Sequence, residues 1–464
     1  MTPYLTVAER VAKGKAARRE VPRSTHGVYQ PPSDRPSPVD LLERQARARL
    51  PHLVPIRYGR MLVSPFTFYR GAALIMASDL SATPRSGLTV QCCGDAHLSN
   101  FGAFASPERR LVFDINDFDE THPGPWEWDL KRLSTSVLIA ARDNGFRRKD
   151  QDEIVLQTVR EYRAALATFA GMGNLDVWYA SVDLDRFVAE HEQEAQRRVV
   201  KRTKAILAKA RTRDSMSAFS KLARQVDGRV EIVSDPPLIL PMEDYTAIPR
   251  AEGIDLLSNL LRQYRASLEP DRRSLLEQYE IEDFALKVVG VGSVGTRAFI
   301  ALLMGRDGRD PLFLQAKEAE ASVFEEFVGR SRFRNHGQRV VTGQRLMQAS
   351  SDIFLGWVTN KEGIDGRPHD YYLRQLRDWK GSVPIEEMLT QGMTAYGRLC
   401  GWTLARAHAR TGDRVAISAY LGKSDVFDRA ILEFSKVYAE QNEQDYAELR
   451  AAVESGRIVA ETGV

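Results

Sequence analysis

The sequence has few cysteines, little net charge and no long apolar segment, and each absence excludes a class of protein. Three cysteines, Cys92, Cys93 and Cys400, do not make a disulfide framework, so we expect a cytoplasmic location. A net charge of +3 over 464 residues argues against a nucleic-acid partner. No apolar run approaches the roughly 18–20 residues that cross a membrane, and no secretory signal is evident, so we expect no membrane partner.

The composition is sufficient for a large folded protein, since 43% of the residues are hydrophobic. The length predicts two or three domains or lobes. Apolar periodicity and turn residues change along the chain and indicate an α+β protein. The expected regions are a basic, proline-rich, loosely ordered arm (1–40), an α-rich region with a small sheet (41–225), a connecting region (226–283), a β-rich region (284–380) and C-terminal helices (381–464).

The segment 94–100, GDAHLSN, follows a predicted buried strand and contains Asp95, His97 and Asn100. A carboxylate at a strand end can accept a hydroxyl proton, and an amide five residues later can hold a metal ion, as in a phosphotransfer catalytic loop. The spacing alone is weak evidence, because a polar turn after a buried strand has the same pattern. His97 either approaches the transferred phosphate or braces the loop.

A second polar segment, LVFDINDFDET, ends another predicted strand with Asp114, Asp117 and Asp119. Two like charges 4 Å apart cost roughly 4 kcal/mol at an effective dielectric constant of about 20, so such a group favours a cation. Magnesium in phosphate sites typically takes one or two carboxylates together with substrate oxygens. An acidic turn on the surface is the simpler alternative.

A third segment, VVGVGSVGTRAF, contains the pattern GxGxxG at Gly290, Gly292 and Gly295. A Rossmann fingerprint requires a helix after the glycines, but here turn glycines and a second apolar run follow, which favours a β-hairpin. A glycine-rich hairpin over nucleotide phosphates is typical of kinases, which also place a lysine on a later strand. LFLQAK supplies that lysine as Lys317.

These segments resemble the protein-kinase-like superfamily, and most closely its aminoglycoside and choline phosphotransferase branch. CGDAHLSN is similar to the branch motif H-G-D-x-H-x-x-N, with Cys93 in place of the first histidine. INDFDE resembles the metal-binding segment and points to Asp117. PWEWDLKRL resembles a motif whose aspartate, here Asp129, anchors the catalytic loop. From about residue 40 to 450, the chain also resembles a bacterial family known only as a domain of unknown function.

The order of these segments differs from that in kinases, because the loop at 94–100 precedes the hairpin and lysine at 290–317. Read cyclically, the order is restored, with 371–382 as a hinge-like strand and linker and 396–412 as the helix before the catalytic loop. The resemblance therefore implies a circularly permuted, two-lobed protein-kinase-like fold with a small β-rich lobe and a larger α-rich lobe. Circular permutation is tolerated where chain ends lie near each other on the surface.

The resemblance implies an ATP-dependent phosphotransferase that uses ATP and Mg²⁺ and moves a phosphoryl group to a hydroxyl of an unknown small-molecule or protein acceptor. The implied roles are catalysis by Asp95 and His97, metal binding by Asn100, Asp117 and Asp114, and nucleotide binding by Gly290, Gly292, Ser293, Gly295, Lys317 and Gln375. The main metal ligand stays open between Asp114 and Asp117. The partner of Lys317 also stays open, with these candidates: Glu320, Glu325, Glu326, Gln338 and Gln344.

Two other functions are compatible with the sequence. A metal-dependent phosphoesterase would arrange acidic and histidine side chains around two metals. Its ligands would be Asp95, His97, Asp114, Asp117 and His122. A nucleotide-binding pseudokinase or scaffold would bind ATP without transferring phosphate. The sequence does not identify the acceptor, and it does not indicate the oligomeric state.

Overall fold

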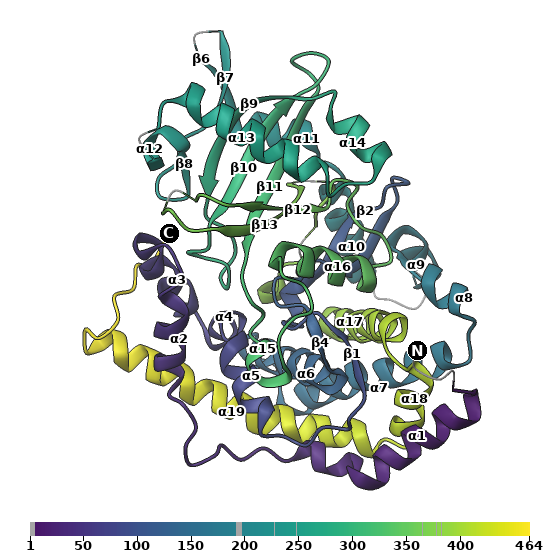
Figure 1. The fold of residues 1–464 in the computed structure, drawn as a ribbon. Helices are drawn as coiled ribbons and strands as arrows, with labels where there is room; N and C mark the ends of the chain where they lie inside the picture. Colours follow the sequence, from purple (N-terminus) through teal and green to yellow (C-terminus); the bar gives the residue numbers. More distant parts are fainter. Residues whose placement is uncertain are drawn as a thin grey trace.

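The computed structural model describes residues 5–191, 197–226, 228–246, 248–363, 365–376, 378–381 and 383–464. A large antiparallel sheet with its covering helices forms one half, and a body of packed helices forms the other (Figure 1). The predicted α+β class is therefore confirmed. In the part of the chain that the structure describes, no helix is both long enough and apolar enough to cross a membrane.

The large sheet has six strands in the order β12-β13-β11-β10-β9-β8, all antiparallel to their neighbours. The strands are β8 Ile239–Pro241, β9 Glu280–Lys287, β10 Ala298–Met304, β11 Pro311–Ala319, β12 Gly356–Asn360 and β13 His369–Gln375. β10 and β11 are nearly continuous apolar runs because both faces of the sheet are covered. Helix α13 (Arg250–Arg265) packs on one face through Tyr264, and α11 (Ser215–Leu222) packs on the other through Leu222.

Two turns connect the central strands of this sheet. The glycine-rich segment 288–297 joins β9 to β10, and a tight turn at 305–310 joins β10 to β11. Because the strand β10 directly follows the glycines, the predicted hairpin is confirmed and the strand-to-helix order of a Rossmann fingerprint is not present. Lys317 lies on β11, opposite Ala298 of β10.

Short sheets carry the two polar segments. The strands are β1 Thr89–Cys92 paired with β4 His122–Pro125, β2 Phe101–Ala105 paired with β3 Leu111–Ile115, β5 Val182–Asp183 beside β3, and β6 Ala223–Val226 paired with β7 Arg229–Ile232. Residues 93–100 follow β1, and residues 116–121 follow β3. We name the first segment the catalytic loop (93–100), after the motif that it resembles, and the second the acidic loop (116–121). Both therefore begin where a buried strand ends, as the sequence predicts.

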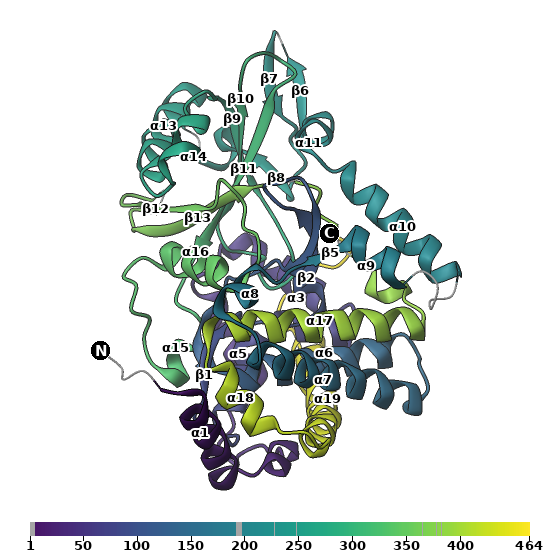
Figure 2. The same ribbon diagram turned by 90° about the vertical axis from the view of Figure 1, so that its right-hand side faces the viewer.

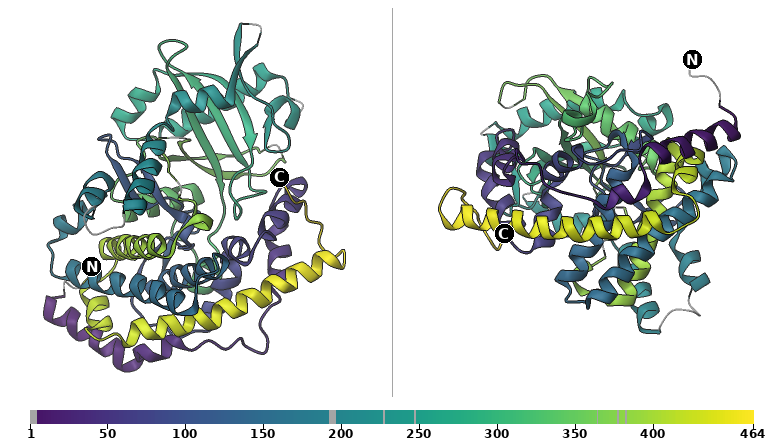
Figure 3. Two further views of the ribbon diagram at one scale, coloured as in Figure 1. Left: turned by 180° about the vertical axis from the view of Figure 1, so that it is seen from behind. Right: turned by 90° about the horizontal axis from the view of Figure 1, so that it is seen from below.

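The helical body is built around four long helices, α6 Trp126–Asp143, α7 Arg148–Ala170, α17 Thr390–Thr411 and α19 Val426–Glu454. α17 lies along α7 (Figure 2), and α19 spans the base of the body (Figure 3). The other helices are α1 Val7–Glu20, α2 Pro38–Ala46, α3 Val54–Met61, α4 Pro65–Gly71, α5 Ala73–Ser81, α8 Asn174–Tyr179, α9 Leu184–His191, α10 Arg197–Arg211, α12 Met242–Thr246, α14 Pro270–Leu276, α15 Glu325–Val328, α16 His336–Met347 and α18 Arg414–Leu421.

The N-terminal arm is more ordered than the sequence predicts. Residues 7–20 form α1, which packs against α18 (Figure 3). The helices approach so closely that a Cβ on Gly14 would lie 2.0 Å from the carbonyl oxygen of Ala416. The contact rests on small residues rather than on an apolar stripe, so hydrophobic periodicity does not reveal it.

A buried ion-pair cluster also fastens this arm. Arg35 donates to Asp79 of α5 at 2.7 Å and to Asp445 of α19 at 2.6 Å. Both carboxylates are almost completely buried. Burial raises the pKa of Asp445, although Arg35 opposes the shift. The arm, α5 and α19 are therefore held by one guanidinium.

We predict that Arg35→Met strongly destabilises the protein, because removing one partner of a buried ion pair typically costs about 3–5 kcal/mol. Arg457→Met is the matched control, since Arg457 also bridges two carboxylates, Asp40 and Glu43, but its side chain is 47% exposed. We expect the control to change the free energy of unfolding far less, because solvent screens an exposed ion pair. The free energies of unfolding in urea measure both, and equal losses would contradict the prediction.

Candidate functional site

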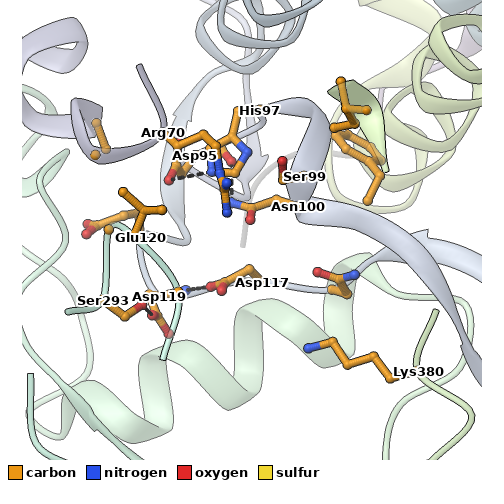
Figure 4. Close-up of a pocket in the computed structure, with 18 of the residues that line it drawn as sticks. Arg70, Asp95, His97, Ser99, Asn100, Asp117, Asp119, Glu120, Ser293 and Lys380 are labelled. Atoms are coloured by element: carbon orange, nitrogen blue, oxygen red, sulfur yellow. Dashed lines mark hydrogen bonds and ion pairs between the residues drawn. The ribbon is translucent and has the colours of Figure 1, made fainter. Parts of the chain in front are cut away.

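A cavity of about 810 Å³ opens where the large sheet meets the helical body (Figure 4). Its lining comes from the catalytic loop, the acidic loop, the glycine-rich segment and helices α2–α4. The sequence-predicted residues that line it are Asp95, His97, Asn100, Asp117, Gly290, Gly292 and Ser293. The structure thus brings the glycine-rich segment next to two loops that lie far before it in the sequence.

The catalytic loop is anchored from below by Asp129 of α6. Its buried carboxylate accepts the backbone N–H of Cys93 at 2.8 Å and of Gly94 at 3.0 Å. His408 of α17 lies 3.2 Å from the same carboxylate. Gly94 has a φ of +82°, and a Cβ there would lie 2.1 Å from the carbonyl oxygen of Glu120, so only glycine fits. Asp129 therefore has the anchoring position that the sequence predicts for it.

Asp95 lines the cavity with its carboxylate held in place. Arg132 donates to Oδ1 from Nε at 2.8 Å and from Nη2 at 2.7 Å. Burial raises the pKa of Asp95 to about 6 and outweighs the opposing effect of Arg132. The carboxylate is thus oriented, and it is mostly ionised near pH 7.

His97 is buried beside Asp95, with Nε2 3.6 Å from the Asp95 Oδ2. Burial holds the pKa of His97 well below its ordinary value, and the positive charges of Arg70 and Arg132 act in the same direction. A neutral, buried ring next to the carboxylate suits a bracing role.

Asn100 and Asp117 offer oxygen atoms to the same side of the cavity. The Asn100 side-chain N–H donates to the Asp95 carbonyl at 2.8 Å, so its Oδ1 is turned to the other side of the amide. The N–H of Asn116 donates to the Asn100 carbonyl at 2.9 Å and ties the two loops together. The Asp117 side chain is 28% exposed.

These two oxygen donors fit a magnesium ion that also takes phosphate and water oxygens. Among the described residues, no group of three or more His, Cys, Asp or Glu side chains is arranged to hold a metal ion. The fit therefore depends on an amide, a carboxylate and ligand oxygens together.

Asp114 does not line this cavity, although the sequence makes it a candidate metal ligand. Its buried carboxylate accepts from Arg406 at 2.5 Å and from the N–H of Ala349 at 2.8 Å. Burial raises its pKa, against the effect of Arg406. Because Asp114 lies within the buried strand β3, it serves packing between strand and helix, and Asp117 is the better candidate.

Lys317 links the sheet to the acidic loop. Its Nζ lies 2.5 Å from Oδ2 of Asp119 and 3.6 Å from Oδ2 of Asp117. The hydroxyl of Tyr372 on β13 donates to Oδ1 of Asp119 at 2.6 Å. The hydroxyl of Ser293 donates to Oδ2 of Asp119 at 3.2 Å. Burial alone would raise the pKa of Asp119. The opposing effect of Lys317 and Tyr372 is larger, so the pKa of Asp119 lies below its ordinary value.

The partner of Lys317 is therefore Asp119, which the sequence did not suggest for this role. None of the five candidates on 320–344 pairs with it among the described residues. Glu325 instead lies near His336 and Arg339, and Glu326 pairs with Arg44. Asp119 lies 198 residues before Lys317, so no local pattern could identify the pair.

Lys317, whose Nζ is held by the acidic loop, is not among the residues that line the cavity, and the predicted nucleotide-binding residues Gly295 and Gln375 also lie outside the lining. The carbonyl of Gly295 accepts the N–H of Leu50 at 2.7 Å, which fixes the glycine-rich segment to the chain after α2. Gln375 ends β13, where its N–H donates to Asp352 at 2.5 Å and its side chain donates to Ser215 at 3.3 Å. Both have structural contacts instead, so a nucleotide contact by Gln375 is not supported.

The cavity also contains cationic residues that sequence reasoning missed. Lys380 points into it from the linker after β13, on the opposite side of the acidic loop from Arg70 (Figure 4). The positive charge of Arg374, together with burial, lowers the pKa of Lys380 to about 7. Others on the lining are Arg49, Arg57, Lys209 and Arg213. Lys209 and Arg213 belong to the strongly charged stretch 187–213, whereas no motif marks Arg49, Arg57 or Arg70.

We predict opposite behaviour for the two aspartates of the second polar segment. Asp114→Asn should lower the free energy of unfolding by about 3 kcal/mol, because it leaves Arg406 buried without a carboxylate. Asp117→Asn should cost about 1 kcal/mol or less, because Lys317 keeps Asp119. Urea unfolding of both variants measures this difference, and a larger loss for Asp117→Asn would refute the structural role of Asp114.

Comparison with known proteins gives a family but no characterised relative. No curated protein and no solved structure matches the chain. A family model described as "Uncharacterized protein conserved in bacteria (DUF2252)" matches residues 49–452, which is most of the chain. The protein whose fold and cavity are described above therefore belongs to this uncharacterized bacterial family, DUF2252.

Proposed function

We propose that this protein is an ATP- and Mg²⁺-dependent phosphotransferase with a circularly permuted, protein-kinase-like arrangement of two lobes. The observation that carries the proposal is the position of Lys317. Its Nζ lies 3.6 Å from Oδ2 of Asp117, which lines the cavity together with Asp95 and Asn100, while Lys317 itself lies outside the lining. A lysine from the sheet and an acidic loop from the helical body therefore meet where nucleotide phosphates and magnesium would bind.

The order of elements in the sheet supports the proposal. A glycine-rich turn joins β9 to β10, Lys317 lies on the next strand, β11, and the helix α16 follows. Kinases have a glycine-rich loop, a lysine on the third strand and then a helix. β13 then leads through the linker that contains Lys380 to the helical body.

Contacts of the C-terminal helices support the permutation. The N–H of Gln91 on β1 donates to the hydroxyl of Thr411, at the end of α17, at 3.2 Å. In an unpermuted order, the helix α17 would lead into the strand β1 and the catalytic loop. The C-terminal part of the chain is thus next to the segment it would precede.

The chemistry follows from the side chains that line the cavity. Asp95, oriented by Arg132, would align the acceptor hydroxyl and take its proton. Asn100 and Asp117 would hold magnesium, which supplies positive charge to the phosphates when bound. Lys317 and the N–H groups near Gly292 would bind phosphate oxygens. Catalysis of this kind is mostly positioning and electrostatic stabilisation.

The phosphoesterase alternative has less support. It needs Asp114 and His122 at the metal site, but Asp114 pairs with Arg406, and His122 contacts the carbonyl of Gly329 at 2.9 Å. Neither Asp114 nor His122 is among the residues that line the cavity. A nucleotide-binding pseudokinase would use the same cavity and differs only in turnover.

We predict that Mg·ATP raises the melting temperature of the wild-type protein and that ATP without magnesium raises it less. Lys317→Ala and Asp117→Asn should each reduce the shift, because one removes a phosphate contact and the other a metal ligand. Lys436→Ala on the surface of α19 is the control and should keep the shift. An undiminished shift in both cavity variants would contradict a nucleotide site between the sheet and the acidic loop.

We also predict that Asp95→Asn reduces phosphate release from ATP, measured with water in place of the unknown acceptor, by about 10²–10⁴-fold, the usual contribution of a general base. Nucleotide affinity should change little, because Asp95 faces the acceptor and not the nucleotide. A coupled phosphate assay and a binding isotherm separate the two effects. Wild-type protein that binds Mg·ATP but releases no phosphate would favour the pseudokinase.

A further inference from the structure

Three arginines form one wall of the cavity beside the glycine-rich segment. Arg49 follows α2, Arg57 lies on α3 and Arg70 lies on α4, and all three line the cavity. The wall is tight against the turn, since a Cβ on Gly292 would lie 3.2 Å from the carbonyl oxygen of Arg70. We name these three residues the arginine wall.

The arginine wall has buried N–H groups without acceptors. Arg57 is 1% exposed, and its Nε and Nη1 have no hydrogen-bond partner within the described parts of the chain. The same holds for Nε of Arg49 and of Arg70. The hydrogen bonds that Arg57 and Arg49 do form go to neutral oxygens. Arg57 donates to the side-chain oxygen of Gln45 at 2.9 Å, and Arg49 donates to the carbonyl of Val294 at 2.5 Å.

Burying the charges of the arginine wall lowers the stability of the protein unless an anion binds to them. Buried charges in proteins are normally paired, and an unpaired one carries a large desolvation penalty. Burial lowers the pKa of all three arginines, and Arg49 and Arg57 also repel each other. The planar guanidinium matches the oxygens of phosphate and carboxylate groups, often with two hydrogen bonds.

Nearby carboxylates do not take the place of this anion. Glu386 and Asp95 act on Arg70, and Glu320 and Glu120 act on Arg49, through their charges. Within the described parts of the chain, none of these four carboxylates forms a hydrogen bond or a close ion pair with the wall, and Asp95 is engaged by Arg132. They compensate part of the charge at a distance and leave the N–H groups free.

The position of Arg70 places one end of the arginine wall away from the two lysines, although the glycine-rich turn lies against the wall. Arg70 lies beside Asp95 and His97, whereas Lys380 lies across the acidic loop (Figure 4). Lys317 is engaged by Asp119 and Asp117 of that loop. An anion bound at the Arg70 end of the wall would therefore lie on the Asp95 side of the cavity, where the acceptor hydroxyl belongs.

We propose that the acceptor carries an oxyanion, either a phosphate ester or a carboxylate, and that Arg49, Arg57 and Arg70 bind it. That the bound molecule is a phosphoryl acceptor rests on the proposed phosphotransferase function. That an anion binds here depends only on the arginine wall. The anion orients the substrate so that its hydroxyl reaches Asp95. Neutral alcohols lack this contact and bind poorly.

Calorimetry with inorganic phosphate and with acetate as probes tests the site. We expect the wild-type protein to bind at least one probe. The affinity of Arg70→Gln for that probe should fall by about tenfold or more, since a charge-assisted contact is lost. Arg49→Gln should behave similarly. Arg44→Gln, an exposed arginine of α2 with a 46% exposed side chain, is the control and should bind as the wild type does.

The identity of the bound probe distinguishes a phosphate ester from a carboxylate. Arg70→Gln removes an incompletely paired buried cation, so its melting temperature without ligand should not fall, which separates lost binding from misfolding. Probe binding that Arg70→Gln and Arg49→Gln leave unchanged would overturn the inference, as would no binding of either probe to the wild type.

Adding Mg·ATP separates this inference from the proposed function. If the two sites are distinct, a probe still binds in the presence of saturating Mg·ATP. If Mg·ATP displaces it, the wall belongs to the nucleotide site and the inference fails. If Mg·ATP does not bind at all while the probe binding depends on Arg70, the proposed function fails and the anion site stands.

Discussion

The ion pair between Lys317 and Asp119 is the contact on which the cavity depends. It joins β11 of the large sheet to the acidic loop of the helical body, and Tyr372 and Ser293 complete the coordination of the carboxylate. Arg339 of α16 holds the same loop through its backbone, donating to the carbonyls of Asp119 and Thr121. The sheet therefore sets the position of the acidic loop, and the acidic loop presents Asp117 to the cavity.

Charge is distributed across the cavity in a pattern that suits two anionic ligands. Asp95 and Asp117 lie centrally, with cationic side chains on both sides. Lys317 and Lys380 belong to the sheet and its linker, while Arg70 belongs to the N-terminal helices. A nucleotide and a charged acceptor would then meet from opposite sides at Asp95. The fastening of the N-terminal arm by Arg35 matters for this arrangement, because α2–α4 follow it in the chain.

The sequence predicted what depends on local pattern. Strands that end in polar residues placed both loops, and the turn glycines between apolar runs identified the hairpins. The anchoring position of Asp129 came from the resemblance of PWEWDLKRL to a family motif rather than from local pattern. The function, the cofactors and the roles of the site residues stay proposals.

The sequence did not predict what depends on distant contacts or on burial. Asp114 and Asp117 are alike in sequence, and only packing shows that Arg406 takes one of them. The partner of Lys317 comes from another half of the molecule, and Gln375 turns away because Asp352 and Ser215 hold it. The arginine wall could not be predicted, because its members lie in three separate segments and nothing in the sequence shows that they are buried.

A double-mutant cycle on Mg·ATP affinity would test most directly whether the sheet and the acidic loop form one nucleotide site. Lys317→Met, Asp117→Asn and the double variant are titrated with Mg·ATP by calorimetry. The account predicts that both single changes weaken binding and that their effects are coupled by about 1 kcal/mol or more, as for residues that share a ligand. Losses that add to within about 0.5 kcal/mol, or no loss in either variant, would contradict it.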